Sequence, residues 1–352
     1  MEPASALAKV AAARPPRWQW RGADCVHSLQ WAPHGHTLAA ATLAGELVSL
    51  SAADGKVRWH VADAHPGGAL WCVFHPTEPL LASGGQDGAV KLWQADTGQL
   101  VRVVVHEPKR WSELGAWSAD GEFLATAAGK AVSFWNAAGE AKGRTADQKA
   151  TVAVLAWHPR DAALLVAAYG GLSVWTPGAA KPDAFLERAT PVLAAAWRPG
   201  GEWAAFGTGD ASMEAWRVGT EETLRMAGYP TKIRELAWHG TGDHLSTGGG
   251  TNVVCWDFRG DGPAGSTPIE FLGHSEFITA LAPHPTDPRR VASTGRDHLV
   301  FVWQTGADDP VAMRAVPDSV PLHVAWQPRA AKEPLLAVGC EGGEIVLFKV
   351  AG

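Results

Sequence analysis

The strongest constraint in this sequence is a repeat with a period of 40–45 residues. Each repeat contains two anchor residues, and the second follows the first by 18–22 residues. Most anchors are tryptophan, which explains why a chain of 352 residues contains 18 Trp but only 2 Tyr. A period of this length is typical of a unit of four short strands that packs against further copies of itself. The eight anchor pairs are Trp31/Leu50, Phe74/Trp93, Trp117/Trp135, Trp157/Trp175, Trp197/Trp216, Trp238/Trp256, Pro283/Trp303 and Trp326/Phe348.

The second unit shows most clearly why four strands are expected. An apolar run ends at Phe74, and further runs cover Leu80–Gly84, Val90–Trp93 and Gly98–Val103. Turn-forming residues separate these runs, including the tripeptide Gln86-Asp87-Gly88. Short apolar runs between Gly, Pro and Asp turns are the pattern of β-strands. The sequence therefore predicts an all-β chain.

The repeat units resemble the WD-repeat β-propeller family. The dipeptide that names the family occurs as Trp256-Asp257, and its Gly-His pair occurs as Gly273-His274. The resemblance implies a hydrogen-bonded tetrad of His, Ser or Thr, Asp and Trp in a unit. The fifth unit keeps only the Asp and the Trp, as Asp210 and Trp216. Two units match the tetrad fully, through His65, Ser83, Asp87 and Trp93 and through His274, Ser293, Asp297 and Trp303.

The chain ends are expected to close the ring. The eighth unit has too few residues after Phe348 for its own outer strand, whereas the segment Arg17–Arg21 alternates as a strand does. Closure matters because an open stack of sheets exposes unpaired edges. The predicted fold is a single closed β-propeller of eight four-stranded blades, with an N-terminal strand in the last blade. We expect a helical or disordered extension at residues 1–14 and the propeller at 15–352.

Composition narrows the classes of partner. There are 30 Lys and Arg residues against 36 Asp and Glu residues, which gives a net charge of −6 and no basic stripe for nucleic acid. No run of 18 apolar residues suggests a membrane span, and the N-terminus lacks the pattern of a secretion signal. The four cysteines are widely spaced, as in a reducing compartment. We expect a cytoplasmic, monomeric ring with a protein or peptide partner and without nucleic acid, membrane or cofactor.

The resemblance also implies a face for binding. In the family, three positions of each blade point to the top face, where the innermost strands begin. Aromatic and arginine side chains dominate the energetics of protein interfaces, and several of these positions carry them here. We therefore predict a non-catalytic scaffold that docks a partner, such as an acidic peptide, on this face. The predicted docking residues are Trp111, Glu113, Tyr169, Lys232, Arg234, Phe277 and Arg296.

Two alternatives belong to other functional classes. Cys25, His27 and Cys340 would lie close together if the first and last units are neighbours, and thiolate and imidazole groups suit zinc. A metal-handling accessory protein is therefore the main alternative. The segment Ala52–Trp59 resembles the tryptophan-docking motif of quinoprotein dehydrogenase propellers, although it occurs only once. No other catalytic motif is found in a fitting context.

Overall fold

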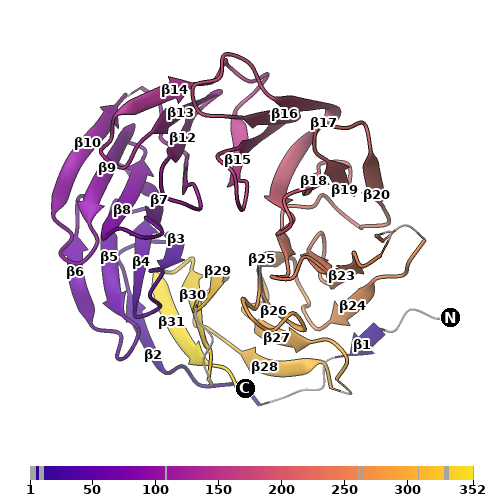
Figure 1. Ribbon diagram of the computed structural model, residues 1–352. Coiled ribbons are helices and arrows are strands. Elements are labelled where there is room, and N and C mark those ends of the chain that lie inside the picture. Colours follow the sequence, from indigo (N-terminus) through magenta and orange to yellow (C-terminus); the bar gives the residue numbers. More distant parts are fainter. Residues whose placement is uncertain are drawn as a thin grey trace.

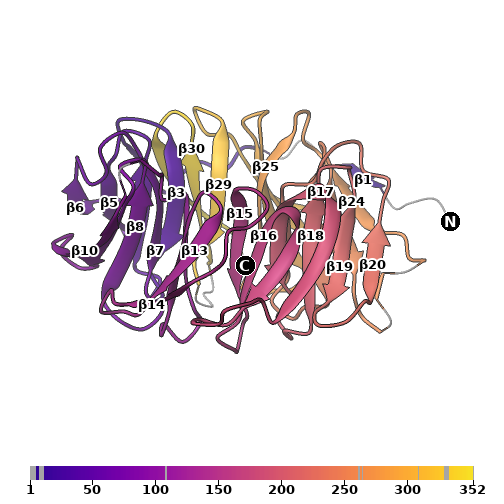
Figure 2. The ribbon, with the colours of Figure 1, turned by 90° about the horizontal axis from the view of Figure 1, so that it is seen from above.

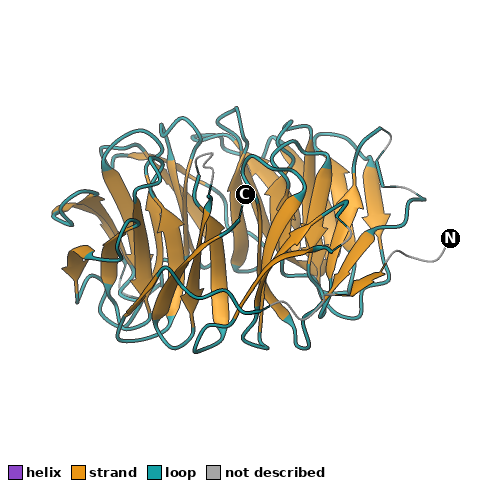
Figure 3. Ribbon diagram, turned by 90° about the horizontal axis from the view of Figure 1, so that it is seen from below, coloured by secondary structure: helices purple, strands orange, loops and turns teal. Residues whose placement is uncertain are grey.

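In the computed structural model, sheets of short strands are arranged around a central axis as a ring (Figure 1). The structure describes residues 5–7, 12–107, 109–260, 262–263, 265–307, 309–328 and 333–351. Seen from the side, the strands form the wall of the ring and the loops lie on its two faces (Figures 2 and 3). The described residues contain strands, turns and loops but no helix. We call the face at which the innermost strands begin the top face.

The first three repeat units each form one antiparallel four-stranded sheet. In each sheet the strands follow chain order from the axis of the ring to its rim, as Figure 1 shows for the second unit. Short apolar strands between tight turns therefore give the predicted pattern in this half of the ring. The strands are β3 (Val26–Trp31), β4 (Thr37–Thr42), β5 (Leu47–Ser51) and β6 (Val57–Val61), then β7 (Ala69–Phe74), β8 (Leu80–Gly85), β9 (Ala89–Gln94) and β10 (Leu100–His106), then β11 (Leu114–Trp117), β12 (Leu124–Ala128), β13 (Ala131–Trp135) and β14 (Ala141–Arg144).

The sixth, seventh and eighth units form the other side of the ring. The sixth unit contains β21 (Leu236–Trp238), β22 (His244–Thr247), β23 (Val253–Asp257) and β24 (Ile269–Leu272). The seventh contains β25 (Ile278–Pro283), β26 (Arg290–Gly295), β27 (Val300–Gln304) and β28 (Val311–Ala315). The eighth contains β29 (Pro321–Trp326), β30 (Leu335–Cys340) and β31 (Glu344–Lys349), and β2 (Trp18–Arg21) completes its sheet.

Strand β2 closes the ring between the two ends of the chain. It pairs antiparallel with β31, from Trp18 opposite Leu347 to Arg21 opposite Glu344. The Trp18 indole N–H also donates a hydrogen bond of 3.1 Å to the Ala52 carbonyl of the first unit. The N-terminal strand therefore covers the edge of β31 and ties the eighth unit to the first.

The prediction of eight four-stranded blades is wrong. The strands form seven hydrogen-bonded sheets, because the fourth and fifth repeat units share one six-stranded sheet. Counted by sheets, the ring therefore has seven blades. The shared sheet contains β15 (Val152–Trp157), β16 (Leu164–Trp175), β17 (Ala184–Trp197), β18 (Trp203–Thr208), β19 (Met213–Arg217) and β20 (Thr223–Met226).

Two long strands explain the merger. The first half of β16, up to Ala168, pairs with β15, whereas its second half, from Tyr169, pairs with β17. Strand β17 in turn pairs with β16 through residues 184–191 and with β18 through residues 192–197. No Asp turn interrupts β16 at Tyr169-Gly170-Gly171, and no loop interrupts β17 where one repeat unit passes into the next. Each of these two strands therefore takes the place of two shorter strands and joins the fourth unit to the fifth.

The N-terminal extension is described only in part. Ser5–Leu7 form strand β1, which pairs parallel with β24 and makes the sheet of the sixth unit five-stranded. Figure 1 shows β1 outside β24 at the rim of the ring. At these three residues a strand lies where a helix or disorder was expected, and residues 1–4 and 8–11 lie outside the described part. The division of the chain at residue 14 stays a prediction.

Most of the tryptophans that form the first anchor of a unit are buried and also donate a hydrogen bond to a neighbouring unit. The Trp31 indole N–H donates to the Ala325 carbonyl at 3.0 Å, which joins the first and last units. Trp157, Trp197, Trp238 and Trp326 donate in the same way to the carbonyl that precedes the anchor of the unit before. The exception is Trp117, whose buried N–H has no partner among the described residues. The repeat therefore supplies both apolar packing and directional bonds between units.

Strand β6 carries a second kind of tryptophan contact. The Trp59 N–H donates to the Ala95 carbonyl at 2.7 Å, and its ring lies so close to Gly98 that a Cβ there would come within 2.7 Å of the ring. Trp18 contacts Ala52 and Gly55 in the same manner. In this chain, the segment that resembles the quinoprotein motif contributes to packing between neighbouring units.

Candidate functional site

The second and seventh units contain complete hydrogen-bonded tetrads. The Trp93 N–H donates to the Ser83 hydroxyl at 2.7 Å, and His65 lies 2.7 Å from Ser83 and 2.8 Å from Asp87. In the seventh unit the corresponding distances are 2.7 Å from Trp303 to Ser293, 2.8 Å from His274 to Ser293 and 3.0 Å from His274 to Asp297. Each chain of bonds runs from the core to the top face and fixes the turn that carries the aspartate.

The charges of the tetrad follow from its burial. Burial lowers the pKa of His65, which favours its neutral form. Burial alone would raise the pKa of Asp87, but the hydrogen bonds from His65, Lys91 and the Ala89 amide lower it to about 2. The same balance lowers the pKa of Asp297. The histidine and aspartate side chains of both tetrads have hydrogen-bond partners within the fold, so we assign them a structural role.

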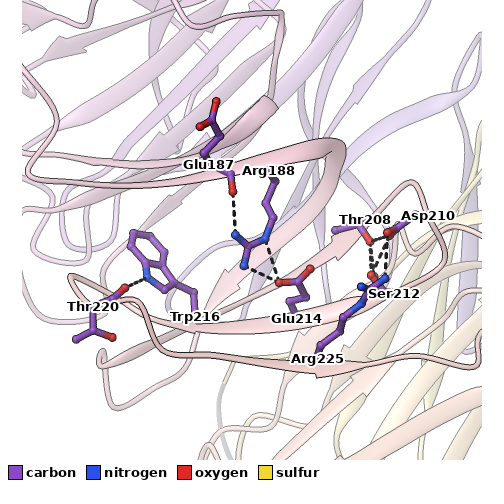
Figure 4. Close-up of polar contacts among 9 residues, drawn as sticks. All are labelled: Glu187, Arg188, Thr208, Asp210, Ser212, Glu214, Trp216, Thr220 and Arg225. Atoms are coloured by element: carbon purple, nitrogen blue, oxygen red, sulfur yellow. Dashed lines mark hydrogen bonds and ion pairs between the residues drawn. The ribbon is translucent and has the colours of Figure 1, made fainter.

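The fifth unit keeps the Asp and the Trp of the tetrad but connects them differently, as Figure 4 shows. Asp210 accepts hydrogen bonds from Thr208 and Ser212, and the Trp216 N–H donates to the Thr220 carbonyl at 2.8 Å. No histidine joins the two. In the same unit Arg188 donates to Glu214 at 3.0 and 2.7 Å, so a largely buried ion pair links β17 to β19.

The sixth unit replaces the tetrad with a tyrosine. The Trp256 N–H donates to the Tyr229 hydroxyl at 2.6 Å, and this hydroxyl lies 2.7 Å from that of Thr247. The turn after β22 contains three glycines at 248–250 and no aspartate. The sequence-based search missed Tyr229, although it precedes Trp256 by 27 residues, close to the spacing of His65 before Trp93.

Four of the seven predicted docking residues line one pocket of 350 Å³ on the top face, between the sixth and seventh units. We call it the cationic pocket. Lys232, Arg234 and Arg296 are exposed in it, and none of them makes an ion pair with any residue that the structure describes. Phe277 is 53 % exposed at its edge.

The cationic pocket also contains one carboxyl group, that of the half-buried Glu235. Burial raises the pKa of Glu235 to about 7, against the opposite effect of Arg234. The pKa of Glu235 means that the net charge of the pocket changes near neutral pH.

The other three predicted docking residues lie elsewhere on the ring. Trp111 and Glu113 line a separate pocket of 450 Å³ on the third unit, with Lys109, Arg110 and Lys130. Glu113 accepts a hydrogen bond of 2.8 Å from the Gly129 amide and so supports the turn after β12. Tyr169 is 53 % exposed and pairs with Pro191 in the shared sheet, outside both pockets. The structure therefore divides the predicted face into two groups and one isolated residue.

The structure offers no support for the zinc alternative. The His27 ring lies 2.7 Å from the Leu70 carbonyl through its Nδ1 atom. Burial raises the pKa of the Cys340 thiol to about 12 and also raises that of Cys25, so both thiols are protonated in the metal-free chain. Within the described ranges, no group of three or more His, Cys, Asp or Glu side chains is placed to hold a metal ion.

Comparisons with known proteins agree with the repeat. A family model described as "WD domain, G-beta repeat" matches residues 59–94 and 265–304, the two segments that contain the complete tetrads. Actin-interacting protein 1-2 of Arabidopsis thaliana is 30% identical over 135 residues, which cover 35% of this chain and 21% of that protein. Cell division cycle 20.1, cofactor of APC complex, from the same plant is 26% identical over 168 residues, or 45% of this chain and 35% of that protein.

Solved structures show the same fold at low sequence identity. The computationally designed Ika8 protein superposes with a TM-score of 0.79 at 16% identity, over 98% of this chain and 99% of that one. A chain of a Mitotic Checkpoint Complex superposes with a TM-score of 0.67, also at 16% identity, with the same coverage. The matched parts span only about a fifth to a third of the two plant relatives.

One further observation concerns membranes. No helix of sufficient length and apolar character to cross a membrane occurs in the part of the chain that the structure describes.

The repeat with its two tetrads and the ring of sheets agree with the matches to the family model and to the relatives. The chain therefore contains two segments that match the WD40 repeat, and its β-propeller fold is similar to that of the two solved structures.

Proposed function

We propose that this protein is a non-catalytic scaffold that binds an acidic segment of a partner protein in the cationic pocket. The observation that carries the proposal is the convergence of Lys232, Arg234 and Arg296 around one pocket, without an ion pair to any described residue. Arginine is well suited to this task because its planar guanidinium group binds a carboxylate through two hydrogen bonds.

The surroundings of the three cations favour a peptide over a lone ion. The exposed ring of Phe277 lies at the edge of the pocket and offers apolar area to a neighbouring side chain. Interfaces concentrate their binding energy in a few aromatic and arginine residues, and complementary charge raises the rate of association. The simplest ligand that contacts both the three cations and the Phe277 ring is a peptide with a carboxylate beside an apolar side chain.

The relatives support a protein partner. One is described as a cofactor of the APC complex, and one similar fold comes from a Mitotic Checkpoint Complex. We further propose a cytoplasmic location and a monomeric ring. The free state of Cys25, Cys72, Cys255 and Cys340, three of them buried, fits a reducing compartment. Fractionation of the host cell and light scattering of the purified protein test these two points.

A peptide selection tests the proposed function. Random twelve-residue peptides displayed on phage are selected on the immobilised protein and then measured against the Arg234→Glu/Arg296→Glu variant. We expect the selected peptides to be rich in Asp and Glu and to lose binding to this variant. Arg160→Glu is the matched control, because Arg160 is an exposed cation beyond the other end of an innermost strand.

The outcomes separate the proposal from its alternatives. Selected peptides that bind wild type and Arg160→Glu alike but not the double variant support docking in the cationic pocket. Peptides without a surplus of acidic residues, or acidic peptides that bind the double variant equally well, contradict the proposal. Thermal melting of all three proteins ensures that the comparison is made between folded molecules.

A further inference from the structure

A second pocket adjoins the cationic pocket. It has a volume of 240 Å³ and lies on the sixth unit, between the loop at residues 227–230 and strands β23 and β24. Its lining includes the rings of Tyr229 and Trp256 and the polar side chains of Asn252 and Glu270. We call it the tyrosine pocket. No role in the tetrads or in the proposed function accounts for it.

The two pockets share a boundary made of glycine. Gly249 and Gly250 line both of them and have φ angles of +96° and +158°. A Cβ on Gly249 would come within 3.0 Å of the Tyr229 ring, and one on Gly250 within 2.9 Å of Pro230. The lining that the two pockets share is therefore backbone without side chains.

The pockets carry opposite charge. The cationic pocket contains Lys232, Arg234 and Arg296, whereas the tyrosine pocket contains the carboxylate of Glu270. Glu270 accepts a hydrogen bond of 3.0 Å from Asn252, which fixes its orientation, and it makes no ion pair within the described ranges. A carboxylate beside an aromatic ring suits an arginine or lysine side chain, which can contact the ring with its stem and the carboxylate with its charge.

We infer that the top face recognises a segment of mixed charge, with a carboxylate in the cationic pocket and a basic side chain in the tyrosine pocket. This inference rests on the proposed function and extends it from an acidic segment to a two-point motif. In an extended peptide, residues two apart point to the same side at a spacing of roughly 6–7 Å. Such a segment crosses the glycine boundary and places one side chain in each pocket.

Synthetic peptides test the inference without knowledge of the natural partner. The acid-only probe is a capped peptide with one Glu between glycines. The two-point probes join Glu to Arg, in both orders, through linkers of one to four glycines. A neutral probe carries Gln in place of Arg. Binding is measured by fluorescence polarisation of a labelled end on wild type, Glu270→Gln, Arg234→Gln/Arg296→Gln and the control Glu221→Gln, an exposed carboxylate on the fifth unit.

We expect the best two-point probe to bind wild type about 10-fold or more tightly than the acid-only probe, because the second contact forms within one molecule. Glu270→Gln should remove this gain and leave the acid-only affinity unchanged, whereas Glu221→Gln should change neither. The inference is overturned if arginine adds nothing at any linker length, or if the gain persists in Glu270→Gln. Failure of the acid-only probe to distinguish wild type from the double arginine variant would instead overturn the proposed function.

Discussion

The sixth and seventh units are neighbours with the same topology, yet they use the top face in different ways. In the seventh unit His274 and Asp297 fill the space beside Trp303 and fix the turn after β26. In the sixth unit the corresponding turn consists of glycines, and a pocket opens on each side of it. In the seventh unit the tetrad therefore fills the space beside the anchor tryptophan, whereas in the sixth unit a pocket lies beside Trp256.

The third unit supports this comparison. It lacks the histidine and the aspartate of the tetrad, although the Trp135 N–H still donates to the Thr126 hydroxyl at 2.9 Å. A pocket of 430 Å³ lies beside Trp135 and is lined by Ser112, Thr126 and Ser133. Cavities beside the anchor tryptophan therefore occur in two units in which the tetrad is incomplete.

We expect the largest loss of stability when Trp303 is replaced. Its side chain is fully buried and donates to Ser293, so Trp303→Ala should lower the free energy of unfolding by roughly 3–5 kcal/mol. Trp256→Ala in the sixth unit should cost less, because Trp256 already borders a pocket. Urea denaturation of both variants measures the difference. Equal losses would show that the tetrad unit is no better packed than its neighbour.

A smaller loss of stability is expected when the hydrogen bonds of the Tyr229 hydroxyl to Trp256 and Thr247 are removed. Tyr229→Phe removes the hydroxyl that accepts from Trp256, and an indole N–H without a partner costs about 1–3 kcal/mol when it is buried. The free energy of unfolding of this variant should fall by that amount. If Tyr229→Phe is as stable as wild type, water replaces the hydroxyl and the pocket beside Trp256 is more open than we describe.

Acid titration distinguishes the two units further. Burial alone would raise the pKa of Asp297, but its bonds to His274 and to the Ser275 and Leu299 amides lower it below the usual 3.8. Asp297 therefore contributes stability above pH 3.8 that is lost as the pH falls below this value. The difference in melting temperature between wild type and Asp297→Asn should shrink between pH 5 and pH 2.5. A constant difference would contradict the proposed role of the Asp297 charge.

The smallest expected effect concerns the pH dependence of binding. Since burial raises the pKa of Glu235 to about 7, its carboxyl group is largely ionised at pH 8 and largely protonated at pH 6. An acidic peptide should therefore bind severalfold more tightly at pH 6, where Glu235 adds no negative charge to the cationic pocket. Glu235→Gln should bind with the same affinity at both pH values. A pH dependence that survives in this variant must come from another group.

Much of the fold could be predicted because the anchor residues repeat with an almost constant period. The closing strand β2 was found from the missing outer strand of the last unit and from the alternation around Trp18 and Trp20. The count of sheets could not be found in this way. Local sequence does not reveal whether Tyr169-Gly170-Gly171 ends a strand or continues it, since that depends on pairing with a distant segment.

The candidate site was only partly predictable. Positions within the repeat identified Lys232, Arg234, Phe277 and Arg296, because equivalent positions of a repeat lie on the same face. Tyr229 was missed because it lies close to the position of the tetrad histidine but is a different residue type, and the repeat gave no indication of Glu270. Whether neighbouring positions share a pocket or lie apart, as with Trp111 and Tyr169, depends on the ring geometry.

The most direct test of the docking proposal is the affinity of one acidic peptide for wild type and for the Arg234→Gln/Arg296→Gln variant, measured at two salt concentrations. We expect wild type to bind at least about 10-fold more tightly, as charge-assisted hydrogen bonds of roughly 1.5–3 kcal/mol each imply. We also expect this advantage to decrease at high salt, because exposed charges are screened. Equal affinities at both salt concentrations would contradict docking in the cationic pocket.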